Sequence, residues 1–183
     1  MIKMRHYVLM AAVLLISKNT LSQAKAVIQF NSYNAVGIVA GNAPIGYTFQ
    51  TVNGVKFKNW FAGAGFGTDN YFMATLPLFA DIKREFKLHK SLFFLYADIG
   101  GHFIANDKKV AANFTTSTKG NLYFDAGLGI KMQTTRKGHL FFSAGNALKN
   151  ITQTMASTDS GFPYKNEFVY KLSRISIRAG YQF

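Results

Sequence analysis

The chain has 183 residues and a formal net charge of +13, with 49% hydrophobic and 15% aromatic residues. This length suits one domain and excludes two well-packed domains joined by a linker. The mean hydropathy is only +0.05, which indicates that apolar and polar residues are interleaved rather than gathered into long helical spans. Cysteine is absent, so disulfides, thiolate metal sites and thiol nucleophiles are excluded.

The first 24 residues have the pattern of a secretory signal peptide. Lys3 and Arg5 precede an apolar run from Tyr7 to Ile16, and the small residues Ser22 and Ala24 follow a polar stretch. The apolar run is about half as long as a membrane-spanning helix requires. We therefore expect cleavage after Ala24, export through the general secretory pathway, and a mature domain of residues 25–183 with a net charge of +10. The alternative is an N-terminal helix that belongs to the mature fold.

The mature sequence alternates between apolar and polar residues with a period of two, which predicts β-strands. The last run is the clearest, because Ile175, Ile177 and Ala179 alternate with Arg174, Ser176 and Arg178. We expect strands at Val27–Ala40, Pro44–Val52, Asn59–Gly67, Thr75–Phe86, Ser91–Ile104, Asn121–Gln133, His139–Gln153 and Phe168–Phe183. An even number brings both ends of the mature chain to one rim. The prediction is an all-β fold, an eight-stranded antiparallel up-and-down transmembrane β-barrel in the outer membrane.

Charged residues of both signs fall on the polar faces of these strands. They are Asp81, Lys83, Glu85, Asp98, Asp125, Lys131, Arg174 and Arg178. If the apolar faces contact lipid, these eight side chains point into the lumen, where an unpaired charge is costly and a hydrogen-bonded network of both signs is tolerated. We expect a structural charge network in a nearly neutral lumen. The alternative is the solvated face of a soluble sheet.

The connections between the predicted strands differ in length. The turns at Asn53–Lys56, Lys87–Lys90 and Thr134–Gly138 are short, and Asn53-Gly54 is a favoured hairpin dipeptide. The loops Asn106–Thr118 and Thr154–Glu167 are long. We expect basic periplasmic turns that contact anionic lipid headgroups or acidic cell-wall polymer, or that form a solvated rim, and external loops that are candidate sites for an extracellular ligand. No nucleic-acid motif accompanies the positive charge, so nucleic-acid binding is rejected.

Aromatic residues near predicted strand ends suggest the two interface girdles of a membrane barrel. They are Trp60, Phe61, Tyr71, Phe72, Phe93, Phe94, Tyr96, Phe141, Phe142, Tyr181 and Phe183. Gly63, Gly65 and Gly67 share one face of their strand, which we place inward, where glycine leaves room for bulky lumen side chains such as Tyr96 or Tyr123.

The segment Arg174–Phe183 resembles the C-terminal assembly signal of outer-membrane β-barrel proteins, with Tyr181 and the terminal Phe183 as its aromatic positions. Thr51–Gly54, Ala62–Gly67, Leu76–Asp81 and Asp125–Lys131 also resemble segments of small eight-stranded barrel-domain proteins of bacterial outer membranes. The resemblance implies insertion by the barrel assembly machinery, which in that family reads the final strand. It implies a scaffold and carries no activity.

The expected role is non-enzymatic: structural, adhesive or envelope-maintaining, with a side-chain-filled lumen and outer-membrane lipids as partners. We assign no catalytic, cofactor-binding or metal-binding residue. The main rival hypothesis is a lipid A-modifying enzyme that uses His102 with Asp98 and one of Ser143, Ser157 and Ser160, but nothing local marks a nucleophile or an oxyanion site. Two further hypotheses are a narrow solute channel and a periplasmic lipocalin-like barrel with an apolar interior.

Overall fold

The computed structural model describes residues 27–42, 44–104, 108–111, 114–134, 138–157 and 164–183. The predicted signal peptide, residues 1–24 with cleavage after Ala24, lies outside the described residues. Within the described residues, no helix has the length and apolar character needed to cross a membrane.

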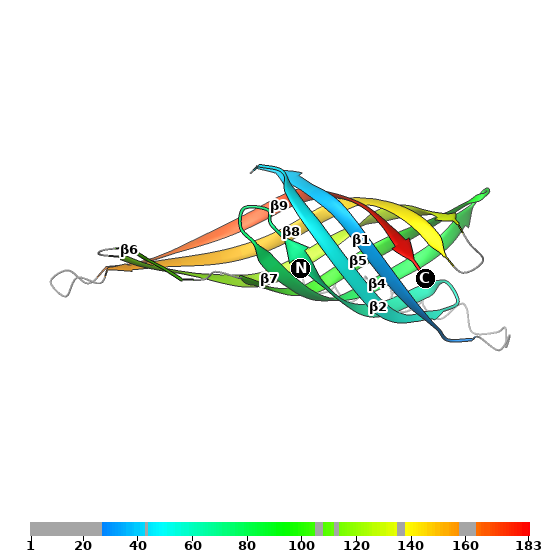
Figure 1. Ribbon diagram of the computed structural model, residues 1–183, viewed down its shortest axis with the longest axis horizontal. Coiled ribbons are helices and arrows are strands. Elements are labelled where there is room, and N and C mark those ends of the chain that lie inside the picture. Colours follow the sequence, from blue (N-terminus) through cyan, green and yellow to red (C-terminus); the bar gives the residue numbers. More distant parts are fainter. Residues whose placement is uncertain (1–26, 43, 105–107, 112–113, 135–137, 158–163) are drawn as a thin grey trace, which may run out of the picture.

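Eight long antiparallel strands close into a barrel, and one short strand extends it (Figure 1). The strands are β1 (Gln29–Gly41), β2 (Gly46–Phe57), β3 (Trp60–Asp69), β4 (Thr75–Leu88), β5 (Ser91–Ile104), β6 (Lys108–Ala111), β7 (Phe114–Gln133), β8 (His139–Ser157) and β9 (Lys165–Gln182). Each long strand pairs with the next long strand, and the pairing of β9 with β1 closes the ring. The predicted all-β, eight-stranded, up-and-down architecture is confirmed.

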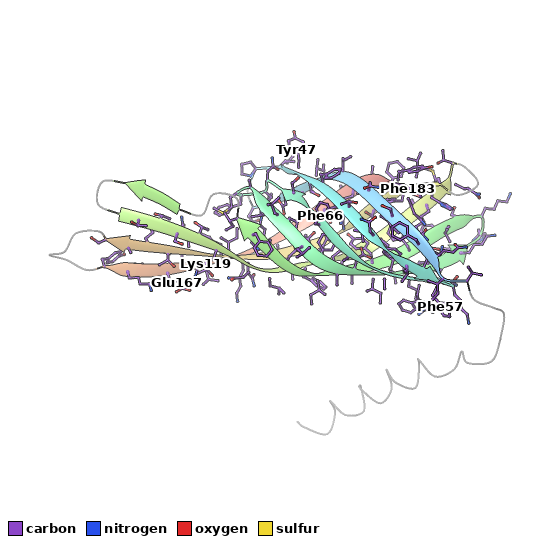
Figure 2. The ribbon with its side chains drawn as sticks, turned by 60° about the horizontal axis from the view of Figure 1, so that its bottom comes forward. Tyr47, Phe57, Phe66, Lys119, Glu167 and Phe183 are labelled. Atoms are coloured by element: carbon purple, nitrogen blue, oxygen red, sulfur yellow. The ribbon has the colours of Figure 1, made fainter. Side chains whose placement is uncertain are left out.

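The barrel carries apolar side chains outside and charged side chains inside. On β4, Leu78 and Ile82 are exposed, whereas Asp81, Lys83 and Glu85 are buried. Figure 2 labels four further exposed aromatic side chains on the outer surface, from β2, from β3 and from the end of the chain: Tyr47, Phe57, Phe66 and Phe183. A lipocalin-like barrel would have the opposite distribution, with its apolar faces turned inward.

The hairpin predicted at Asn53-Gly54 is wrong. Both residues lie inside β2, and the turn to β3 follows Phe57, at Lys58, which has a φ of 54°. Gly54 pairs with Gly63 on β3, and a Cβ at Gly54 would lie 2.5 Å from Gly63 Cα. Glycine is therefore needed at position 54 for the close approach of two backbones rather than for a turn.

The two long loops are also wrong as predicted, because strand covers nine of the thirteen residues of Asn106–Thr118 and half of those of Thr154–Glu167. We call the resulting extension the arm: residues 108–111, 114–120, 151–157 and 165–173 of β6, β7, β8 and β9. It projects beyond the barrel as one antiparallel sheet, with Lys119 and Glu167 along it (Figures 1 and 2). Threonines favour this extension, since β-branched side chains suit a pleated sheet: Thr115, Thr116, Thr118, Thr152 and Thr154.

Part of the predicted aromatic girdle belongs to the interior instead. Phe61, Tyr71, Phe94, Tyr96 and Phe141 are buried. Exposed aromatic side chains of the outer surface include Trp60, Phe72, Phe142 and Phe183. Successive strand residues point to opposite faces, so an adjacent pair such as Phe141 and Phe142 must divide between lumen and exterior.

Candidate functional site

The structure places all eight residues of the predicted charge network inside the barrel. Each has at most 6% of its surface exposed, so their charges cannot be balanced by solvent. They lie in three groups along the barrel, which we call the inner, middle and outer layers. The inner layer is nearest Gln29 and Phe183, and the outer layer is nearest the arm.

The inner layer is built around Glu85 on β4. Its carboxylate forms ion pairs with Lys131 of β7 and Lys56 of β2. Lys131 Nζ also donates hydrogen bonds to Tyr33 Oη at 2.5 Å and to Gln182 Oε1 at 2.7 Å. Since Lys131 therefore joins three different strands, this layer ties β1, β4 and β9 together at one end of the lumen.

A second carboxylate of β4, Asp81, forms an ion pair with Lys83 two residues along the same strand. The ammonium of Lys83 also lies 4.7 Å from the ring centroid of Tyr33 and 5.4 Å from that of Phe61. Aromatic faces attract a cation at such distances. Lys83 is thus held between the inner layer and the middle layer.

Arg178 of β9 is the centre of the middle layer. Its Nη1 lies 3.4 Å from Asp98 Oδ2 and its Nη2 lies 3.1 Å from Asp125 Oδ2, while Gln50 accepts a further hydrogen bond. Tyr96 Oη donates to Asp125 Oδ1 at 2.9 Å. Asp81, Asp98 and Asp125 are successive register partners on β4, β5 and β7. Like charges in such positions repel, and cations offset this repulsion: Arg178 pairs with Asp98 and Asp125, and Lys83 pairs with Asp81.

The outer layer contains residues that the sequence analysis missed. Asp69 at the end of β3 forms ion pairs with Arg174 and, at 3.6 Å, with Lys149 of β8. Lys149 Nζ donates to Thr75 Oγ1 at 2.8 Å. A sequence signal existed for both, because Asp69 continues the inward series of Gly63, Gly65 and Gly67, and Lys149 continues that of Phe141 and Ser143.

Among the described residues, the formal charges of the buried acidic and basic side chains balance. Five buried acids, Asp69, Asp81, Glu85, Asp98 and Asp125, are matched by five buried cations, Lys83, Lys131, Lys149, Arg174 and Arg178. Ion pairs join residues from different walls of the barrel. Removing one member therefore leaves a charge in a region that water does not reach freely.

Aromatic rings fill the space between the charged layers, and each of several rings lies opposite a glycine on a neighbouring strand. These register pairs are Phe79 with Gly65, Phe94 with Gly129, Tyr96 with Gly127, Tyr123 with Gly100 and Phe141 with Gly180. A Cβ at Gly65 would lie 2.5 Å from Phe79 Cε2. The predicted role of inward glycine is thus seen in several strands, with Phe79 rather than Tyr96 or Tyr123 beside Gly65.

A small cavity remains near the middle of the lumen, lined by Tyr33, Ser143 and Arg178 among others. Its volume of about 20 Å³ is room for about one or two water molecules. The rings of Phe79 and Tyr123 lie 5.4 Å apart on one side of the lumen. The interior resembles a packed core more than a conduit for solutes.

The residues proposed for the enzyme hypothesis are not brought together. The His102 ring contacts the Asn150 carbonyl at 2.8 Å, whereas Asp98 pairs with Arg178. Ser143 is level with Phe94 of β5, because both are register partners of Gly129. His102 lies eight residues further along β5, so Ser143 and His102 are about 26 Å apart along the strand direction. Ser157 lies at the tip of the arm, and Ser160 is outside the described residues. The described residues also contain no group of three or more His, Asp or Glu side chains suited to a metal ion.

The predicted assembly signal lies at the seam that closes the barrel. Phe183 exchanges two backbone hydrogen bonds with Ser32 of β1, at 2.9 and 3.1 Å. The Phe183 side chain is exposed on the outer surface, and its ring centroid lies 6.3 Å from that of Tyr181. Both aromatic positions are therefore presented outside the lumen at the end of the last strand.

No protein-family model and no curated protein matches this sequence. Among solved structures, the chain is similar to the translocator domain of the autotransporter NalP from Neisseria meningitidis, at 12% identity and a TM-score of 0.23. The alignment covers 99% of this chain and 96% of that domain.

Proposed function

We propose that the chain is an integral outer-membrane β-barrel with a structural or adhesive role, exported through the general secretory pathway and inserted by the barrel assembly machinery. The observation that carries the proposal is the inverted distribution of side chains. Exposed apolar residues surround the barrel, whereas five acids and five cations are buried within it. Such a surface suits hydrocarbon, and water would not favour it.

The proposed adhesive role requires a part of the protein outside the cell, and we assign the arm to that part. Gln29 at the start of β1, Phe183 and the tight turns that follow β2 and β4 lie at one rim, whereas the arm extends from the other. Barrels inserted from the periplasm keep their termini and short turns on the periplasmic side. In that orientation the arm projects from the cell surface, and Lys56, Lys58, Lys87 and Lys90 lie near the inner headgroups.

Fractionation of cells tests this proposal. The mature protein is expected in the detergent-extracted outer membrane, and its gel migration should change on heating, because a closed barrel resists detergent until it is boiled. A freely soluble periplasmic product would contradict the proposal. Protease added to intact cells should cut the arm, whereas the turns near Lys58 and His89 should become accessible only after the outer membrane is permeabilised.

A further inference from the structure

One edge of the arm has no neighbouring strand among those that the structure describes. β9 pairs with β8 from Lys165 onward, but its pairing with β1 begins only at Arg174, opposite Gly41. Residues 165–173 therefore form an open edge, along the border of the arm that carries Glu167 in Figure 2. Phe168 is 41% and Val169 is 57% exposed. Open edges of this length are templates for pairing with another strand.

The hydrogen-bonding direction of this edge follows from its two ends. Phe183 exchanges both backbone bonds with Ser32 on the β1 side, and the Tyr164 carbonyl accepts a bond from Ser157 on the β8 side. The register between β8 and β9 is continuous from Lys165 to Gln182. Because the direction alternates along a strand, the odd-numbered residues from 165 to 171 present their N–H and C=O groups to the open edge, whereas the Ser173 carbonyl already lies beside Gly41 of β1.

The open edge is self-complementary. Val169 lies at its centre, and antiparallel pairing about a two-fold axis at Val169 joins residues 167–171 of the two copies. In this register Glu167 of each copy lies opposite Lys171 of the other, and Phe168 lies opposite Tyr170 on the other face. Opposite charges and aromatic pairs in such positions stabilise a sheet. A shift of the axis to Phe168 would instead place Lys165 opposite Lys171.

Both charged residues are available for this pairing. Glu167 is exposed, as is Lys171, and neither forms an ion pair with another side chain in the part of the chain that the structure describes. They lie on the same face of β9 with Val169 between them, because all three positions are odd. Two copies would therefore exchange two ion pairs on one face of a joined sheet.

We propose that the open edge of β9 binds the same edge of a second copy of this chain on a facing membrane. Antiparallel pairing places the two barrels at opposite ends of the joined arms, because the arm extends the barrel along the long axis of the molecule (Figure 1). Two copies in one membrane have arms that point the same way and cannot form this pairing. The facing-membrane part rests on the proposed function, whereas the pairing itself does not require a membrane.

Cross-linking in detergent tests the pairing. The chain has no cysteine, so Val169→Cys introduces a single thiol, and paired residues of this kind lie about 5.5 Å apart. A short bismaleimide is expected to give a covalent dimer of the folded full-length mature protein. Lys119→Cys is the control, because Lys119 is exposed on the arm but lies on β7, away from the edge. Equal dimer yields from both variants would overturn the proposal.

Charge exchange gives a sharper test in the Val169→Cys background. Glu167→Lys alone and Lys171→Glu alone each create two like-charged pairs, and each is expected to lower the dimer yield about tenfold. An equimolar mixture of the two variants pairs opposite charges again and should restore a dimer that contains one copy of each. Failure of the mixture to restore cross-linking would overturn the proposal.

Vesicles separate this inference from the proposed function. Two vesicle populations, each carrying one of the two charge variants with its arm outward, are expected to cluster only when mixed. If heat-modifiable barrel is present in both populations and neither clustering nor cross-linking occurs, the pairing is wrong while the membrane barrel stands. If cross-linking occurs in detergent but the cellular protein is soluble, the pairing stands and the facing-membrane arrangement is wrong.

Discussion

Arg174 and Asp69 form an ion pair across the lumen, although 105 residues separate them in the sequence and they belong to β9 and β3. Lys149 completes the cluster, so one carboxylate faces two buried cations. The outer end of the barrel is thus held by contacts between opposite walls, in addition to the hydrogen bonds between neighbouring strands.

Asp69→Asn is expected to destabilise the barrel by about 3–5 kcal/mol, because it leaves two buried cations without their counter-charge. Urea-induced unfolding of the detergent-folded protein measures the loss. Glu167→Gln, on the exposed arm, is the control and should change stability by less than about 0.5 kcal/mol. Adding Lys149→Met to Asp69→Asn removes one excess cation and should recover part of the loss; no recovery would contradict the charge argument.

Gly65→Ala is expected to destabilise the barrel by about 1–3 kcal/mol, because the new methyl group overpacks the lumen. The added Cβ would lie within 2.6 Å of two ring atoms of Phe79. Gly101→Ala is a matched control, since a Cβ there meets its nearest atom, the Asn121 carbonyl oxygen, at 3.6 Å. The double variant Gly65→Ala/Phe79→Leu should unfold at a higher urea concentration than Gly65→Ala alone.

Phe183→Ala is expected to lose most outer-membrane insertion in cells while retaining the ability to fold in detergent, if the machinery reads the last strand. Quantitative fractionation and in vitro refolding measure the two properties separately. Phe142→Ala removes another exposed aromatic ring from the barrel surface and is the control for lost lipid contact. Equal insertion of the two variants would remove the basis for treating Phe183 as an assembly signal.

Deletion of the gene is expected to leave the lipid A mass spectrum unchanged, because Ser143 lies far along the barrel from His102. His102→Ala should instead lower stability by about 1–3 kcal/mol, since the partly buried Asn150 carbonyl loses its contact with the His102 ring. A lipid A change that depends on the gene and disappears in the His102→Ala variant would establish the enzyme hypothesis.

The wild-type barrel is expected to show no steady conductance in planar bilayers, because ion pairs and aromatic rings fill its lumen. Phe79→Ala/Tyr123→Ala removes two neighbouring rings and should introduce small conductance events or raise their frequency. Wild-type conductance of the size expected for an open pore would support the solute-channel hypothesis instead.

The direction of each side chain followed from the sequence wherever strand alternation was regular. Asp81, Lys83 and Glu85 could be assigned to one face because a period of two is a local property of extended backbone. The same alternation at the C-terminus separated Arg174 and Arg178 from the outward residues up to Phe183. The number of strands and their antiparallel order could be predicted from the alternating segments and the short connections between them.

The ends of the strands could not be found in this way. Considered alone, Asn53-Gly54 suits a turn as well as it suits a strand. Only the close approach of β2 to β3 at Gly63 shows why glycine is needed within the strand. The parts of the arm that the sequence analysis assigns to loops, such as residues 114–118 and 165–167, are mostly polar and have no alternating apolar face, so local patterning did not identify them as strand. Pairing between β7, β8 and β9 supplies the hydrogen bonds that make them a sheet.

The sequence by itself determined the barrel class and eight of the ten charges that point inward, since both depend on local alternation. Only the tertiary structure decided that Arg174 pairs with Asp69, that Arg178 holds Asp98 and Asp125, and that the edge centred on Val169 is open. Those relationships depend on which walls meet across a closed ring and where a neighbouring strand stops. Neither is encoded in the pattern of a single strand, because both arise when all the strands come together.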